Sequence, residues 1–96
     1  MIKSFACRAT EAIFNDRQAP ELPPSIQTTA RRKLVQINLA QKLSDLRVPP
    51  GNRLEALKDD RAGQHSIRIN DQWRICFKWT AGGVADVEIA DYHQDQ

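Results

Sequence analysis

The last third of the chain alternates between apolar and polar residues with a period of two. Residues 66–70 carry isoleucine at both odd positions, and residues 73–79 carry Trp, Ile, Phe and Trp at theirs. Such alternation is typical of strands that bury one face. Asn-Asp-Gln at 70–72 has the composition of a tight turn, so the two runs predict a hairpin. A third run, 84–91, follows Thr-Ala-Gly-Gly at 80–83, which extends the prediction to a meander of three antiparallel strands.

The second turn also predicts which residues face each other across the sheet. With the turn centred near Gly82, Arg74 lies within a residue or two of Ala90, and such opposed or diagonal side chains are about 5–8 Å apart. The next residues supply an acid, a phenol and an imidazole: Asp91, Tyr92 and His93. Two interpretations fit. Either these groups form a proton-transfer site beside a guanidinium, or Arg74 and Asp91 form a structural ion pair and His93 takes no part.

The first quarter of the chain predicts a short strand, a short helix and a connecting loop. Residues 2–5 alternate and are expected to add a strand beside the meander. A brief helix over 11–14 ends at the Asn-Asp pair 15–16. The three prolines within 18–24 exclude helix and central strand there, and a proline pair suits the start of a following helix.

Residues 25–46 form the longest segment with helical periodicity, which predicts a helix with a wide apolar stripe facing the sheet. The stripe consists of Ala30, Leu34, Val35, Ile37, Leu39, Leu43 and Leu46. The solvent side is expected to carry Arg31, Arg32, Gln36 and Lys42. Pro-Pro-Gly at 49–51 ends the helix, residues 53–57 predict a short strand, and residues 58–63 predict a polar turn.

These elements follow the order β-α-α-β-β-β-β and predict one α+β domain spanning residues 1–96. Helices followed by antiparallel strands pack on one face of an antiparallel-dominated sheet. The other face is then open, and Arg53, Glu55 and the end of the last strand are candidates to line it.

Composition narrows the class of protein further. A chain of 96 residues with 41% hydrophobic and 27% charged residues suits one soluble globular domain. No apolar run approaches the roughly 18 residues of a membrane span, and the start lacks a signal peptide's apolar core, so a cytoplasmic location is expected. Cys7 and Cys76 are too few for a disulfide framework and lack metal-ligand spacing, which predicts two reduced thiols.

Charge is weakly basic and concentrated in the middle of the chain. The net charge is +2, and residues 31–61 contain eight basic side chains against four acidic ones. This distribution suits contact with a polyanion but falls short of a protein that holds free nucleic acid by charge alone. A solvated helix face explains the basic run at 31–33 equally well.

Six segments carry a similarity that extends over the whole chain. They are IKSF at 2–5, PPGNRLE at 49–55, LK at 57–58, SIRIN at 66–70, WRICF at 73–77 and VEIADYH at 87–93. In this order they resemble the HigB-type toxins of the RelE superfamily. The specific part is the combination of Ile-Arg-x-Asn-x-x-Trp-Arg with a terminal Asp-Tyr-His, because either motif alone would be a weak signal.

The resemblance implies an mRNA endonuclease that cuts message within the translating ribosome. It also implies neutralisation by a helix-turn-helix antitoxin of the HigA type, with operator DNA reached only through that antitoxin, and no cofactor, metal or membrane partner. By matching position, the catalytic candidates are Lys58, Arg74, Asp91, Tyr92 and His93. Candidates for contact with RNA or the ribosome are Arg31, Arg32, Lys33, Arg53 and Glu55. Some relatives carry His where this chain has Glu55, so either Glu55 takes a different role or fewer groups catalyse.

The chemistry is reasonable for these residue types. RNA can be cut by its own 2′-OH, which needs a base, an acid and cations for the phosphorane rather than a metal or a covalent nucleophile. An imidazole such as His93 exchanges protons near neutral pH. Arg74 and Lys58 suit phosphate, Asp91 is a base or orients a neighbour, and Tyr92 stacks on a base or donates to phosphate.

Two other functions remain open at this stage. A ParE-like toxin of the same fold binds DNA gyrase without cutting RNA, but it has no need of Asp-Tyr-His after the last strand. An inactive module that only tethers an antitoxin is the third possibility. His65 is expected to be a structural hydrogen-bonding residue, and Trp73 and Trp79 are expected in the core.

Overall fold

The three strands of the meander form as the alternation predicts. The computed structural model describes residues 1–91, in which β2 (His65–Arg68), β3 (Trp73–Thr80) and β4 (Gly83–Asp91) are consecutive antiparallel neighbours. The Asn70 side-chain oxygen accepts the backbone N–H groups of Gln72 and Trp73, both at 2.8 Å, and this fixes the first turn. Across the second hairpin Arg74 pairs with Ala90, so the predicted register is confirmed.

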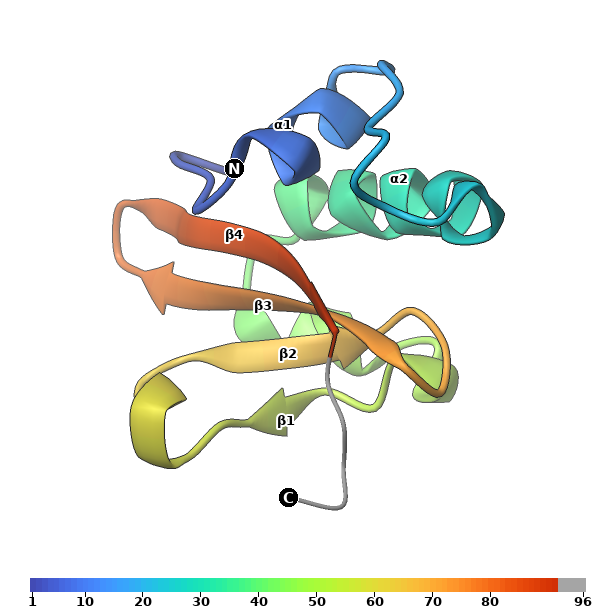
Figure 1. The fold of residues 1–96 in the computed structure, drawn as a ribbon. Helices are drawn as coiled ribbons and strands as arrows, with labels where there is room; N and C mark the ends of the chain where they lie inside the picture. Colours follow the sequence, from blue (N-terminus) through green and yellow to red (C-terminus); the bar gives the residue numbers. More distant parts are fainter. Residues whose placement is uncertain (92–96) are drawn as a thin grey trace.

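The α+β architecture is also confirmed. Helices α1 (Arg8–Phe14) and α2 (Pro24–Leu39) lie together on one side of the sheet, whose strand order is β1-β2-β3-β4 (Figure 1). Strand β1 (Glu55–Ala56) has only two residues and pairs with β2. Short 3-10 turns complete the chain: η1 (Leu43–Arg47), η2 (Pro50–Asn52) and η3 (Asp59–Arg61). None of the helices in residues 1–91 combines the length and apolar character needed to cross a lipid bilayer.

The expected strand at residues 2–5 does not form as a continuous element. Ile2 and Phe5 instead make two isolated parallel bridges, to Val84 and Val87 of β4. Between these bridges Asp86 has a φ of 55°, and the β3–β4 register shifts there. This bulge interrupts the edge that a continuous N-terminal strand would need.

The predicted helix over residues 25–46 is too long by seven residues. Helix α2 ends at Leu39, and the Asp45 carboxylate accepts the N–H groups of Gln41 at 2.9 Å and Lys42 at 3.2 Å. These bonds hold the pKa of Asp45 below its usual range. The early end turns Leu39 out to 71% exposure, and Val35 is 42% exposed, so both were wrongly assigned to the apolar stripe.

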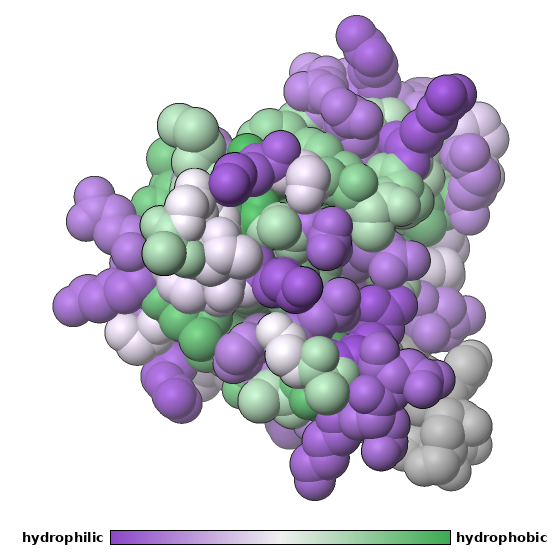
Figure 2. Space-filling model, turned by 90° about the vertical axis from the view of Figure 1, so that its left-hand side faces the viewer, coloured by the Kyte–Doolittle hydropathy of each residue, from purple (hydrophilic) through white to green (hydrophobic). Residues whose placement is uncertain are grey.

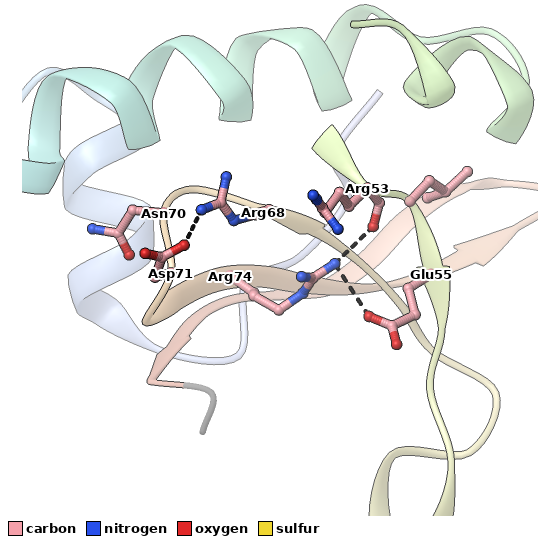
Figure 3. A pocket seen from close by; sticks show the side chains of 7 residues that line it. Arg53, Glu55, Arg68, Asn70, Asp71 and Arg74 are labelled. Atoms are coloured by element: carbon pink, nitrogen blue, oxygen red, sulfur yellow. Dashed lines mark hydrogen bonds and ion pairs between the residues drawn. The ribbon is translucent and has the colours of Figure 1, made fainter. Parts of the chain in front are cut away.

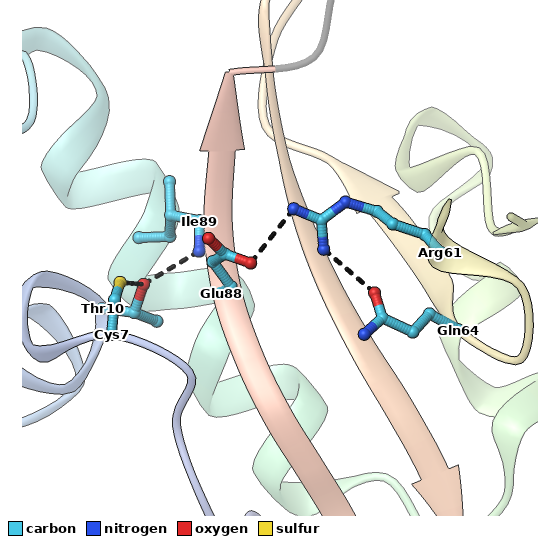
Figure 4. Close-up of polar contacts among 6 residues, drawn as sticks. All are labelled: Cys7, Thr10, Arg61, Gln64, Glu88 and Ile89. Atoms are coloured by element: carbon cyan, nitrogen blue, oxygen red, sulfur yellow. Dashed lines mark hydrogen bonds and ion pairs between the residues drawn. The ribbon is translucent and has the colours of Figure 1, made fainter. Parts of the chain in front are cut away.

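The core lies between the helices and one face of the sheet. Ala30, Leu34 and Ile37 of α2 are fully buried, as predicted, and Trp73 and Trp79 pack against the same core. Polar contacts join the layers (Figure 4). The Thr10 hydroxyl of α1 accepts the backbone N–H of Ile89 at 2.8 Å. On the opposite sheet face Arg61 of η3 binds Glu88 of β4 at 3.1 Å and Gln64 at 3.0 Å. Polar contacts therefore hold β4 to α1 on one side of the sheet and to η3 on the other.

The sheet face opposite the helices is less open than the alternation predicts. Arg74 is only 6% exposed, and Cys76 is fully buried. Burial raises the pKa of the Cys76 thiol. Both cysteines are free thiols, as predicted. The segments that cover this face also form the candidate site.

A candidate active-site cleft around Arg74

A cleft of about 510 Å³ lies between the β2–β3 hairpin and the segment that enters β1 (Figure 3). It is lined by Arg53, Leu54, Glu55, Arg68, Asn70, Asp71 and Arg74. Three of these side chains are arginines and two are carboxylates, which leaves one positive charge in excess. The sequence nominated Arg53, Glu55 and Arg74, and the fold brings these three together.

Arg74 is held in the cleft by contacts from two neighbouring segments. Its Nε donates to the Ser66 hydroxyl at 2.7 Å, and its Nη2 donates to the backbone carbonyl of Arg53 at 2.7 Å. The same Nη2 lies 3.3 Å from the Glu55 carboxylate. A guanidinium with these contacts is fixed in orientation before any ligand arrives, which is what bidentate recognition of phosphate requires.

The carbonyl that holds Arg74 comes from an unusual backbone position. Arg53 follows η2 with a φ of 47° and a ψ of 58°, the left-handed region that a non-glycine residue rarely adopts. Its N–H donates to the Pro50 carbonyl at 3.1 Å, while its own carbonyl accepts from Arg74. Conformations of this kind persist where the surroundings determine them, and they cluster at functional sites.

Two arginines face each other directly across the sheet. Arg68 of β2 pairs with Arg74 of β3, and like charges at opposed positions destabilise a sheet. Each is compensated by a carboxylate, since Arg68 forms an ion pair with Asp71 and Arg74 forms one with Glu55 (Figure 3). A second cation opposite Arg74 makes the cleft suited to an anion.

Glu55 lines the cleft beside Arg74. Its side chain is 51% exposed, while that of its partner Arg74 is 7% exposed. The carboxylate is therefore the accessible member of the pair.

The basic run at 31–33 is not one solvated face. Lys33 is buried at 9% exposure, and its Nζ donates to the Asn52 side-chain oxygen. Desolvation by burial, with smaller contributions from the charges of Arg32 and Arg68, lowers the pKa of Lys33. Arg31 donates to the Ile13 carbonyl at 2.9 Å, and Arg32 is exposed. The amine of Lys33, a candidate for contact with RNA or the ribosome, is therefore bound inside the protein.

Two other catalytic candidates, Asp91 and Lys58, lie outside the cleft lining. Asp91 pairs with Trp73 rather than with Arg74, so its side chain alternates to the other face of the sheet, and its carboxylate accepts from Gln72 Nε2 at 3.1 Å. Arg74 forms its ion pair with Glu55, whereas one of the two interpretations of the sequence paired it with Asp91. Lys58 is exposed at the start of η3. The candidates Tyr92 and His93 fall outside the described residues.

His65 does not line the cleft either. Its ring stacks on Phe77 with centroids 6.3 Å apart, and within residues 1–91 its buried Nδ1 has no hydrogen-bond partner. The expectation of a structural residue fits the stacking, but that nitrogen makes no hydrogen bond.

Sequence reasoning missed four of the groups that build the cleft. They are Ser66, Arg68, Asn70 and Asp71. A signal for Arg68 was present, because a turn at 70–72 places residue 68 opposite residue 74 and so sets two arginines side by side. The alternation also put Ser66 and Arg74 on one face.

A second hollow of about 520 Å³ lies at the other end of β3, beside the β3–β4 turn and the end of α2. The β3–β4 turn faces the viewer in Figure 2, where green and white side chains gather over the upper and middle part of the surface. Among residues 1–91 its lining includes Leu39 and Trp79 and no Asp, Glu, Lys, Arg or His side chain. It offers no charged side chain for a phosphate, so the arginine-lined cleft is the candidate site.

Comparison with known proteins identifies the family of this chain. Residues 3–93 match the family described as RelE-like toxin of type II toxin-antitoxin system HigB. Over 83 residues the chain is 44% identical to Toxin HigB-1 of Vibrio cholerae, covering 85% of this chain and 87% of that protein. It is 30% identical over 97 residues to Endoribonuclease HigB of Proteus vulgaris, covering 97% and 100%. The solved YoeB-YefM complex from Staphylococcus aureus has the same fold, with a TM-score of 0.60 at 19% identity over 98% of this chain and 97% of that chain.

Proposed function

The chain belongs to the family of HigB-like, RelE-like toxins of type II toxin-antitoxin systems, and we propose that it is an endoribonuclease that cuts mRNA on the translating ribosome. Such cleavage stops translation and growth and takes place in the cytoplasm. The similarity to the Proteus vulgaris protein named as an endoribonuclease supports this activity. Toxins of this family belong to toxin-antitoxin systems. For this chain we propose a helix-turn-helix antitoxin of the HigA type, and the toxin would reach operator DNA only through that antitoxin.

The observation that carries the proposal is the fixed guanidinium of Arg74. It is bound by Ser66 and the Arg53 carbonyl and opens onto a cleft with Arg53 and Arg68 nearby. Cleavage of RNA by its own 2′-OH passes through a phosphorane that carries more charge than the starting phosphate. Donors that are already oriented stabilise that charge without reorganising, and removing one such donor typically costs about 2.7–4 kcal/mol of barrier.

Proton transfer is assigned to the remaining candidates. Glu55 is the exposed carboxylate beside Arg74 and suits the base that takes the 2′-OH proton. His93 suits the acid that protonates the 5′-oxygen, since a free imidazole titrates near neutral pH. Asp91 is proposed to orient these groups, and Tyr92 to orient the base beside the scissile phosphate. Lys58 is proposed to contact the RNA backbone. No step requires a metal ion.

Dependence on the ribosome follows from the modest charge. The chain has a net charge of +2, and the cleft has one positive charge in excess. Affinity for nucleic acid scales with the number of phosphates neutralised, so free RNA would bind weakly and positioning would come from the ribosome.

The test is primer extension on a reporter message after induction of the toxin, with growth measured in the same cultures. Wild type is expected to cut the message, whereas Arg74→Ala and His93→Ala are expected to lose cleavage. Lys78→Met, which removes an exposed cation of β3 outside the cleft lining, serves as the matched control. Growth arrest without cleavage would replace the proposal with a gyrase-binding toxin, and neither effect would indicate an inactive tethering module.

A further inference from the structure

Asn52 is a fully buried amide whose hydrogen-bonding groups are used inside the protein. Its Nδ2 donates to the Leu46 carbonyl at 3.1 Å and lies 3.4 Å from both the Val48 carbonyl and the Gln36 side-chain oxygen. Its Oδ1 accepts from the Lys33 amine. A buried amide whose nitrogen has acceptors and whose oxygen has a donor holds its own backbone segment in place.

The lysine that meets Asn52 is itself unusual. Lysine is almost never fully buried unless it is paired, yet Lys33 is 9% exposed in the second half of α2. The positive charges of Arg32 and Arg68 oppose its protonation. Its burial therefore costs free energy, and the contact that offsets this cost is the one to Asn52.

Asn52, which binds Lys33, directly precedes Arg53, the residue with the left-handed backbone conformation at the cleft. Asn52 is the last residue of η2, and the next residue, Arg53, takes the left-handed conformation with a φ of 47°. With Asn52 anchored on one side, the Arg53 carbonyl points to Arg74 Nη2 at 2.7 Å. A rigid link thus runs from α2 through η2 to the guanidinium.

We propose that Lys33 and Asn52 are positioning residues that hold the Arg53 carbonyl against Arg74 and so orient the guanidinium for the phosphorane. They act from inside the protein and do not touch RNA. The effect on RNA cleavage rests on the proposed nuclease function. The contacts that connect Lys33, Asn52 and Arg53 to Arg74 are present in the free protein.

The kinetic test uses Asn52→Ala and Lys33→Met in a cleavage assay with purified ribosomes programmed with message. Lys42→Met removes an exposed lysine from the segment just after α2 and is the matched control. Both positioning variants are expected to cleave about tenfold more slowly at saturating ribosomes, with the half-saturating ribosome concentration unchanged. A rise in half-saturation with an unchanged maximal rate would overturn the inference, because it would mean a contact with RNA or the ribosome.

A double-mutant cycle separates positioning from general stability. In an Arg74→Lys background, which lacks the oriented fork, Asn52→Ala is expected to slow cleavage by less than twofold. An undiminished tenfold loss in that background would refute a role through Arg74. If neither Asn52→Ala nor Lys33→Met folds, the pair is a general stability element and the inference fails.

A readout without RNA separates this inference from the proposed function. In wild-type protein with ¹⁵N-labelled arginine, the Arg74 Nε–H is expected to exchange slowly with water, and in Asn52→Ala at least tenfold faster. Faster exchange in Asn52→Ala, in a protein that never cuts message, would refute the nuclease proposal and support the positioning role of Asn52. Unchanged exchange in an Asn52→Ala protein that has lost cleavage would refute the positioning role and leave the nuclease proposal standing.

Discussion

Replacing Arg74 with alanine tests both the stability and the chemistry of the cleft. The alternation in the sequence predicts an exposed Arg74 whose loss leaves folding untouched, but the side chain is 7% exposed and bound to Ser66 and Arg53. Truncation leaves the buried Ser66 hydroxyl without its donor, and an unsatisfied buried group costs about 1–3 kcal/mol. We expect a free energy of unfolding lower by about 2 kcal/mol, which lowers Tm by roughly 8–16 °C in a domain of this size.

The same change removes a donor for the phosphorane. A barrier raised by about 2.7–4 kcal/mol corresponds to cleavage roughly 100- to 1000-fold slower. Because the variant is less stable, both proteins are compared at a temperature at least 15 °C below the lower of the two Tm values. Loss of activity by unfolding is thereby kept apart from loss of chemistry.

Thermal unfolding by circular dichroism and cleavage of ribosome-bound message are the two assays. Arg74→Lys is the control that keeps the charge but lacks the planar fork, and it is expected to fall between wild type and Arg74→Ala in rate. An Arg74→Ala protein with the wild-type Tm would contradict the anchoring described above. One with the wild-type rate would contradict the role in phosphorane stabilisation.

Four further outcomes are expected. Thr10→Val should lower the free energy of unfolding by about 1–3 kcal/mol, because the Ile89 N–H loses its acceptor; urea denaturation measures this, and an unchanged midpoint contradicts it. The raised pKa of Cys76 keeps the native thiol protonated where the unfolded chain ionises, so wild-type stability should fall relative to Cys76→Ala as pH rises above 9.0; equal pH profiles would exclude this. Deleting residues 93–96 should abolish message cleavage while deleting 94–96 preserves it, and cleavage by the shorter chain would reassign proton transfer to Glu55 or another acid. Purified protein should barely cut naked RNA, and efficient metal-dependent digestion of free RNA would refute ribosome dependence.

The strands were predictable because their pattern is local. The period-two alternation and the turn at 70–72 determine the hairpin, and the register that places Arg74 opposite Ala90 follows from the second turn. Chain order then gives the α+β class. The helix end was not predictable in the same way, because Leu43 and Leu46 continue the helical spacing while Asp45 binds the N–H groups that begin η1.

The site was only partly predictable, since its geometry depends on contacts between distant segments. The alternation of the strands makes Arg74 a polar position, the basic run of the predicted helix includes Lys33, and polar positions are normally exposed. Nothing in the local pattern reveals that the carbonyl of residue 53 covers Arg74 or that Asn52 draws Lys33 inside. The placement of Asp91 beside Arg74 failed for a simpler reason: Asp91 is the residue after Ala90, and successive side chains of a strand point to opposite faces of the sheet.

The contacts between the first residues and β4 also determine when during synthesis a complete toxin exists. The Ser4 hydroxyl accepts the N–H of Asp86, 82 residues away, and Thr10 binds Ile89 across 79 residues. A chain is made from its N-terminus at about 5–20 residues per second, so α1 has no sheet to dock on until β4 has left the ribosome. A message interrupted before residue 84 yields a chain without β4 and without a docked α1. Synthesis must therefore reach the end of β4 before the chain can complete its sheet and dock α1 on it.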